Sequence, residues 1–303
     1  MIETKFTLKS NFDGLQIAGK VIAPNMEAKG IVQICHGMAE HRKRYYDFMR
    51  YLANEGFVCV VHDHRGHGES VYSSDDWGYF YEDSGKAIVE DAYQVSCYIQ
   101  QQYPNLPLYL FGHSMGSLVV RNYLQEHDDM LDKLIVCGSV SQQSVVGFAI
   151  VLTKLISLFK GDRHRSKLLR TLVLGSNDKK FKGNEFNRWL STNEENVKEY
   201  NRMPDTGFMF TNNGYLNLFR LMKDCYRKNL YKVKNTNISV LFVAGEDDPI
   251  IVSKDKWLDS QEYLKNLGYR DVSGVLYPGL RHEILKEKNK DTVYRDILNF
   301  INK

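Results

Sequence analysis

The chain has 303 residues, of which 43% are hydrophobic and 25% are charged. These are the proportions of a globular protein, and they exclude collagen-like, disordered and low-complexity classes. Forty Lys and Arg residues against 37 Asp and Glu residues leave a formal charge of +3, with both signs interspersed along the chain. A charge this small gives no reason to expect nucleic acid as a partner.

The cysteines and the N-terminus point to a reducing compartment. The five cysteines are an odd number without a Cys-x-x-Cys pair, and Cys35, Cys59 and Cys137 lie inside apolar runs. Buried free thiols explain this pattern better than disulfides or a metal site. No secretory signal opens the chain, and no apolar stretch approaches the roughly 20 residues that span a bilayer. We therefore expect a cytoplasmic protein.

Short β-rich runs alternate with longer amphipathic runs, which predicts an α/β fold. The first two strands flank the turn at residues 11–14 and are expected to pair as an antiparallel hairpin. The later strands are continuous apolar runs, typical of parallel strands covered on both faces. Eight strands are predicted, at Lys5–Leu8, Leu15–Ile22, Ile31–Cys35, Val58–His62, Leu108–Phe111, Leu134–Cys137, Val240–Ala244 and Gly274–Tyr277. Helices are predicted near Tyr45–Glu55, Gly85–Gln102, Ser114–Glu126, Trp257–Leu267 and Thr292–Ile301.

The alternation stops after Ser139 and resumes at Ile238. Between these points the sequence shows helical patterns and loops without a convincing pair of strands. We predict a helical cap at residues 140–229, inserted into an α/β core formed by residues 1–139 and 230–303. The cap opens with an apolar run over residues 145–159. This run is interpreted either as a helix buried against the rest of the cap or as an apolar rim that contacts an acyl chain or, transiently, a membrane surface.

The most informative motif is Gly112-His113-Ser114-Met115-Gly116, a G-x-S-x-G pattern. An apolar strand precedes it and a helix-compatible run follows, so the chain turns directly from strand to helix at Ser114. Such a turn strains the backbone of the serine and lifts its hydroxyl above the carboxyl edge of the sheet. Gly112 and Gly116 would relieve the crowding. Because a serine hydroxyl is a poor nucleophile at neutral pH, a base must accompany it.

The acid and the base are expected later in the chain. A buried strand ends in Glu246-Asp247-Asp248-Pro249, and a further strand ends in a loop that carries His282. His282 is the only histidine downstream of these acids, so we predict it as the base. Pro249 restrains the backbone of Asp248, which favours Asp248 as the orienting acid and leaves Asp247 as the alternative.

A tetrahedral oxyanion needs two preorganised N–H donors. We predict the backbone amide of Met115, which follows the nucleophile, and that of Met38, in the loop after an early strand. Gly37 allows that loop to turn sharply. Glu40 and His41 are expected to brace the same loop.

Two polar clusters have plain structural interpretations. The His62–Ser70 segment contains three histidines, but no ligand set in it has a recognisable metal spacing; we predict no metal and a loop held by internal Asp–Arg pairing. The segment at residues 286–290 is predicted to be solvated surface. No cofactor is expected.

Taken together, these segments resemble the α/β-hydrolase superfamily. Within it they are similar to the bacterial lysophospholipase and monoacylglycerol lipase group, also described as serine-aminopeptidase-like hydrolases. The resemblance extends into the cap around Trp189, Pro204 and Phe208. It is carried by the ordered motifs HGMAEHRKRY, DHRGHGES, GHSMGS, GEDDPI and PGLRHEIL.

The resemblance implies a mostly parallel eight-stranded sheet flanked by helices, with a cap over an acyl pocket. It also implies a Ser114–His282–Asp248 triad, with the amides of Met38 and Met115 as oxyanion donors. Two departures leave the substrate open: Thr206 stands where the group often has a small residue or cysteine. Ile251 replaces a cysteine that monoacylglycerol lipases carry just after the acid.

We expect a cofactor-free serine hydrolase of carboxylic esters with one acyl chain, such as monoacylglycerols or lysophospholipids. The alternatives are a short-chain or aryl carboxylesterase, a peptidase or amidase, and a binding protein without turnover on the same scaffold. A small-molecule ester is the expected partner. The sequence does not indicate acyl length, head group or oligomeric state.

Overall fold

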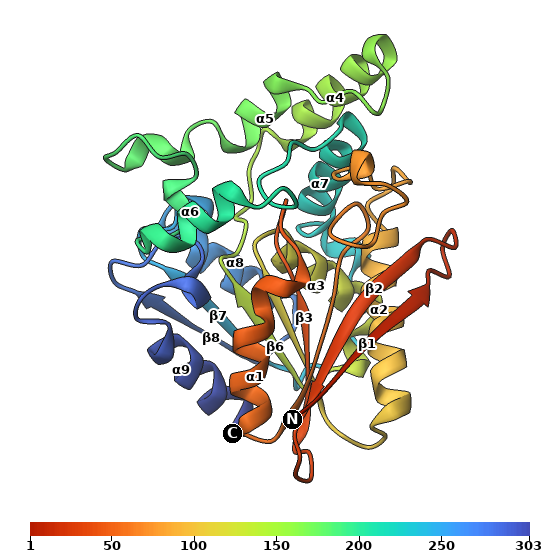
Figure 1. Ribbon diagram of the computed structural model, residues 1–303, viewed down its shortest axis with the longest axis vertical. Helices are drawn as coiled ribbons and strands as arrows, with labels where there is room; N and C mark the ends of the chain where they lie inside the picture. Colours follow the sequence, from red (N-terminus) through yellow and green to blue (C-terminus); the bar gives the residue numbers. More distant parts are fainter.

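Eight strands form one sheet in the computed structural model, which describes residues 1–303 (Figure 1). Their order across the sheet is β1-β2-β4-β3-β5-β6-β7-β8. Strand β2 runs antiparallel to both of its neighbours, and all the other pairs are parallel. The strands are β1 (Ile2–Lys9), β2 (Gln16–Ala23), β3 (Gly30–Cys35), β4 (Phe57–His62), β5 (Leu108–His113), β6 (Lys133–Cys137), β7 (Ser239–Gly245) and β8 (Asp271–Tyr277).

Nine α-helices cover the sheet and its carboxyl edge. Helices α1 and α9 pack on one face with one hydrophobic core, and α2, α3 and α8 pack on the other face with a second, larger core. The helices are α1 (Tyr46–Asn54), α2 (Ala87–Gln102), α3 (Met115–His127), α4 (Val146–Lys160), α5 (Lys167–Leu174), α6 (Glu194–Arg202), α7 (Asn212–Asp224), α8 (Lys254–Leu267) and α9 (Lys290–Asn302).

Strand β3 shows why the central runs are almost entirely apolar. Ile31 and Cys35 contribute to the core under α2 and α3, whereas Val32 and Ile34 contribute to the core under α1 and α9. Successive side chains of a strand point to opposite faces, so a strand covered on both sides carries mainly apolar residues. The one polar side chain of β3, Gln33, is hydrogen-bonded to helix α2 through both its amide nitrogen and its amide oxygen. All six residues of β3 are buried.

The predicted α/β architecture, its eight strands and its five core helices are confirmed. The bounds differ most at β1, which begins at Ile2, and at β8, which begins at Asp271. These strands form the two edges of the sheet, and the parts that the prediction missed carry exposed polar or charged residues, namely Glu3 and Thr4 in β1 and Asp271 and Ser273 in β8. Pairing with a neighbour extends them beyond the apolar signal that the sequence shows.

In-register pairing brings the functional loops together. Cys35 pairs with Gly112, and His113 pairs with Cys137, so β3, β5 and β6 end at the same level. Because β7 and β8 are parallel to them, the loops after all five strands meet at one edge. This carboxyl edge is where open α/β sheets bind ligands.

The chain between β6 and β7 lies over this carboxyl edge (Figure 1). We call residues 140–229 the cap. Helix α4 packs along α7, which in turn packs on α3; α5 and α4 lie farthest from the sheet (Figure 1). No helix has both the length and the apolar character needed to cross a membrane.

Candidate active site

Ser114 occupies the turn between β5 and α3. Its backbone has φ +55° and ψ −117°, a conformation that costs a non-glycine residue about 1–3 kcal/mol and recurs at functional sites. Its amide donates a hydrogen bond of 3.0 Å to the carbonyl of Cys137 at the end of the neighbouring strand. The strain is therefore held in place by the sheet itself.

The two glycines beside Ser114 are required by close packing. A Cβ at Gly116 would collide with the carbonyl oxygen of Cys35, and a Cβ at Gly112 would lie 2.6 Å from Val120 Cγ2. Because the two glycines have no Cβ, α3 can start directly behind the sheet edge. The prediction that Gly112 and Gly116 relieve crowding at this turn agrees with these distances.

Asp248 and His282 are brought together by the loops after β7 and β8. Their side chains meet with 2.8 Å between His282 Nδ1 and Asp248 Oδ2, and both residues are buried. The other carboxylate oxygen of Asp248 accepts the amide of Ile250 at 2.8 Å, which fixes its orientation. The neighbouring Asp247 is exposed, so geometry favours Asp248 over Asp247 as the acid that orients the imidazole.

The imidazole of His282 is enclosed by two residues, Trp189 and Gly138, that no sequence motif assigns to it. The Trp189 ring, from the cap, lies 4.9 Å from it, centroid to centroid. On another side, a Cβ at Gly138 would lie 3.0 Å from His282 Cε1. Gly138, at φ +54°, therefore leaves room for the imidazole beside Asp248.

The loop after β3 presents the Met38 amide. This amide donates to no group of the protein, whereas the preceding Gly37 amide donates to Glu40 Oε1 at 2.5 Å. Met115 is the first residue of α3, where a helix has no carbonyl of its own for the N–H groups. Ser114 Cβ approaches the same loop, 3.2 Å from where a Cβ of Gly37 would lie.

Glu40 braces this loop from inside the protein. It accepts hydrogen bonds from Tyr45 Oη at 2.7 Å and from Arg44 Nε at 3.0 Å, and its Oε1 lies 3.4 Å from His113 Nδ1. Burial alone would raise the pKa of the Glu40 carboxyl, but His113 and Arg44 outweigh it and hold that pKa well below its usual range. The other ring nitrogen of His113 lies 3.2 Å from the carbonyl of His282. A single buried network thus supports the turn of Ser114, the loop of Met38 and the loop of His282.

Four buried histidines, His36, His62, His64 and His67, pack against one another beside the Met38 loop. His36 Nε2 accepts the amide of His64 at 2.9 Å, and His67 Nε2 accepts the amide of Ala39 at 3.2 Å. Both contacts require a neutral imidazole. Burial, reinforced by the neighbouring His36, lowers the pKa of His67 to about 3, and burial likewise lowers that of His62 to about 3.

The internal pairing predicted for the His62–Ser70 loop is wrong. Asp63 pairs with Arg42 of the Met38 loop, whereas Arg65 pairs with Asp91 and Asp13, each at 2.8 Å. Both charges therefore tie this loop to other parts of the core. Neighbouring residues of opposite charge do not pair when the backbone directs them to different sides.

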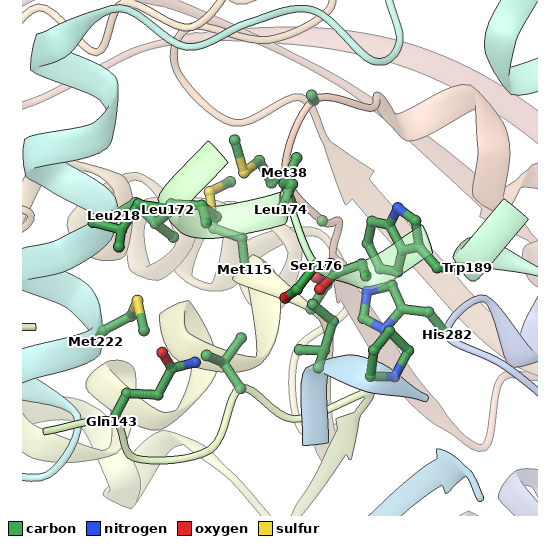
Figure 2. Close-up of a pocket in the computed structure, with 18 of the residues that line it drawn as sticks. Met38, Met115, Gln143, Leu172, Leu174, Ser176, Trp189, Leu218, Met222 and His282 are labelled. Carbon is green, nitrogen blue, oxygen red and sulfur yellow. The ribbon is translucent and has the colours of Figure 1, made fainter. Parts of the chain in front are cut away.

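A cavity of about 740 Å³ lies between the carboxyl edge and the cap, and Ser114, His282, Met38 and Met115 all line it. Figure 2 shows Trp189 and His282 at one end of it and an apolar group at the other. The apolar group at that end is formed by Leu172, Leu218 and Met222, and Met38 and Met115 lie between the two ends (Figure 2).

Residues 188–202 of the cap, which we call the anchored half, are tied to the loop of His282. Arg281 Nη1 donates to the Arg188 carbonyl at 2.6 Å, and the Glu283 amide donates to the Leu190 carbonyl at 2.7 Å. The amide of Thr192 donates to the carboxylate of Glu287 at 2.9 Å. Glu287 is buried, so the prediction of a solvated surface at residues 286–290 is wrong at this position.

Residues 146–174, helices α4 and α5, form the apolar half of the cap. Val146, Ala149 and Thr153 are the buried residues of α4. The opposite side is exposed, with exposed fractions of 67% for Phe148 and 79% for Phe159. The apolar run is therefore not buried all round, and an apolar surface remains on the outside of the cap.

The sheet order, the strained serine between β5 and α3, and an Asp–His pair at the same edge define an α/β-hydrolase. The chain belongs to the serine aminopeptidase S33 family of hydrolases, whose model matches residues 26–289. The resemblance inferred from the motifs is confirmed.

Individual relatives agree with this assignment. The chain is 23% identical to monoacylglycerol lipase of Mycolicibacterium smegmatis over 95% of this chain and 93% of the relative. It is 26% identical to human monoglyceride lipase, but this match spans only 64% of the chain and 58% of the human protein. A solved carboxyl esterase from Bacillus coagulans, in complex with glycerol, superimposes with a TM-score of 0.91 at 26% identity, covering 100% of this chain and 98% of the esterase.

Proposed function

We propose that this chain hydrolyses carboxylic esters that carry one acyl chain, through a covalent acyl-enzyme on Ser114. The observation that carries the proposal is the cavity: it joins Ser114 and His282 to an apolar end. Its volume, about 740 Å³, falls within the range of small-molecule sites. The names of the relatives, monoacylglycerol lipase and carboxyl esterase, support the same class of reaction.

In the proposed reaction, Ser114 Oγ attacks the ester carbonyl carbon while His282 takes the hydroxyl proton. Asp248 holds the imidazole and stabilises its charged form, and the Met38 and Met115 amides bind the oxyanion. Collapse breaks the carbon–oxygen bond, and His282 returns the proton to the leaving alcohol. A water molecule, deprotonated by His282, then attacks the acyl-enzyme and releases the carboxylic acid and free Ser114.

The cap supplies the specificity in this proposal. Residues 140–229 act as a cap on a core of residues 1–139 and 230–303, and the apolar end of the cavity receives the acyl chain. The outer surface of the apolar half contacts the lipid aggregate from which a poorly soluble ester is drawn. Two of the basic residues after α4 are engaged within the chain, since Arg163 pairs with Asp76 and Arg165 donates to the carbonyl of Trp77. We therefore expect contact driven by apolar side chains.

The substrate class is tested by hydrolysis rates for p-nitrophenyl esters from acetyl to palmitoyl, with Ser114→Ala as the inactive control. A maximum at medium or long chains is expected. Met222→Trp narrows the apolar end, and should lower the rate for long chains about tenfold while changing the acetyl rate by less than about twofold. A maximum at acetyl or butyryl that falls steeply with length would favour a short-chain carboxylesterase instead.

The surface contact is tested with phosphatidylcholine vesicles. The double variant Leu158→Ser, Phe159→Ser should co-sediment less than the unaltered protein, at an unchanged rate on acetyl ester. Equal co-sedimentation of the two proteins would remove the membrane part of the proposal and leave the ester hydrolysis intact.

A further inference from the structure

Three buried polar side chains from distant parts of the chain form a closed triangle. Arg44 Nη2 donates to Glu283 Oε2 at 2.6 Å and to Asn196 Oδ1 at 3.2 Å, and Asn196 Nδ2 donates to the same Glu283 oxygen at 2.6 Å. The three residues are at most 6% exposed. Arg44 lies just before α1, Asn196 lies on the cap helix α6, and Glu283 lies in the loop after β8.

Each corner of the triangle belongs to a different part of the proposed machinery. Glu283 directly follows His282 in the chain. Arg44 also binds Glu40, which holds the amide of Gly37 next to the Met38 donor. The triangle therefore links the base loop and the oxyanion loop to one cap helix.

Helix α6 contacts the oxyanion loop a second time, one turn further along. Tyr200 Oη donates to the carbonyl of Ala39 at 3.0 Å, and the Arg44 guanidinium lies 5.0 Å from the centre of the Tyr200 ring. Ala39 has a φ of +53°, which is uncommon for a residue with a side chain. The same helix thus holds the residue after Met38 in a strained conformation.

Burial makes the geometry of this triangle strict. A buried ion pair is tolerated when the remaining hydrogen-bonding positions of both partners are satisfied. The Asn196 amide supplies one donor to Glu283 and one acceptor to Arg44, so its loss leaves both groups short of a partner. The two loops would then move to recover contacts, and small displacements of reacting groups are costly in rate.

Arg44 and Asn196 do not line the cavity that contains Ser114, so neither touches a substrate bound there. We propose that Arg44 and Asn196 are positioning residues, which act through Glu283 and Glu40 to set the orientation of His282 and of the Met38 amide. The anchored half of the cap then takes part in the chemical step in addition to enclosing the substrate. This inference rests on the proposed ester hydrolysis.

The test compares Asn196→Ala with Asn201→Ala. Asn201 is on the same helix, is exposed, and binds only Asn187 and Phe186 of the cap. With p-nitrophenyl acetate, whose acyl group is too short to reach the apolar end, Asn196→Ala should lower kcat by about 10- to 100-fold. Its KM should stay within about twofold, and Asn201→Ala should match the unaltered protein in both constants.

An unchanged kcat in Asn196→Ala, or a raised KM with unchanged kcat, would overturn the positioning role. If Asn196→Ala does not fold, Arg44→Lys keeps the positive charge outside the cavity but cannot reproduce the fork of donors to Glu40, Glu283 and Asn196, and it carries the same expectation for kcat. Reaction of the unaltered protein with a fluorophosphonate probe separates the two levels. If the unaltered protein neither reacts with the probe nor hydrolyses esters, the proposed function is refuted. If it reacts and the variants keep the kcat of the unaltered protein, only the positioning role is refuted.

Discussion

The two halves of the cap are held in different ways. The anchored half makes buried hydrogen bonds and an ion-pair network with the loop of His282. The apolar half packs α4 on α7 and is tied to the core through its connecting loop, where Arg163 pairs with Asp76. Buried polar contacts are satisfied in one arrangement only, whereas apolar packing tolerates rearrangement. The difference therefore separates a part held in one arrangement from a part whose packing can rearrange.

The largest expected effect comes from removing the charge at the centre of the anchored half. Arg44→Met leaves Glu40 and Glu283 buried without their cation, and breaking a buried ion pair in this way costs about 3–5 kcal/mol of unfolding free energy. Urea unfolding followed by circular dichroism measures it. The matched variant Arg163→Met, which breaks a pair whose arginine side chain is 58% exposed at the apolar half, should lower the unfolding free energy by less than about 1 kcal/mol. Equal losses would contradict the contrast between the halves.

A second effect is a pH dependence of the unfolding free energy that originates in the buried histidines beside the Met38 loop. His62 has a pKa of about 3 in the folded protein, lowered by burial from 6.5. Its neutral form therefore contributes stability that is fully present above pH 6.5 and is lost as the pH falls towards 3. The contribution falls by about 1.4 kcal/mol per pH unit within that window.

His62→Leu tests this, because neither ring nitrogen of His62 has a hydrogen-bond partner to lose. Between pH 6 and 4, the variant should show a slope of unfolding free energy against pH that is shallower by about 1.4 kcal/mol per unit. Identical slopes would show that His62 is protonated in the folded protein.

The smallest expected effect is on the outside of the apolar half. Leu158→Ser with Phe159→Ser removes side chains that are 76% and 79% exposed, so the unfolding free energy should change by no more than about 0.5 kcal/mol per substitution. A loss above about 2 kcal/mol for the pair would mean that this surface packs against something within the chain.

Local patterns predicted the sheet and the motif residues because each is encoded by neighbours in the chain. The apolar runs of β3 to β7 indicate strands covered on both faces, and the position of Ser114 between a strand and a helix indicates the strained turn. The order of Ser114, Asp248 and His282 followed from the same logic, and the structure brings Asp248 and His282 within 2.8 Å.

The polar network around the site could not be predicted in this way. Arg44 and Glu283 are 239 positions apart, and no local sequence pattern around either residue predicts that they pair. Glu287 illustrates the same limit: it lies in a lysine-rich segment, yet it is buried because Thr192 of the cap and the amide of Arg281 bind its carboxylate. Exposure of the outer face of α4 was equally open, since an apolar helix gives no sign of which side meets the core.

The strained backbone of Ser114 sets stability against activity. With φ at +55°, the residue occupies a conformation that glycine adopts without penalty. Ser114→Gly should therefore abolish hydrolysis and relieve backbone strain, which raises the unfolding free energy by about 1 kcal/mol. The greater conformational entropy that glycine gives the unfolded chain offsets part of this gain. The inactive Ser114→Gly protein would then unfold at a higher temperature than the active protein. Selection for stability alone would favour glycine at the position where the proposed reaction requires serine.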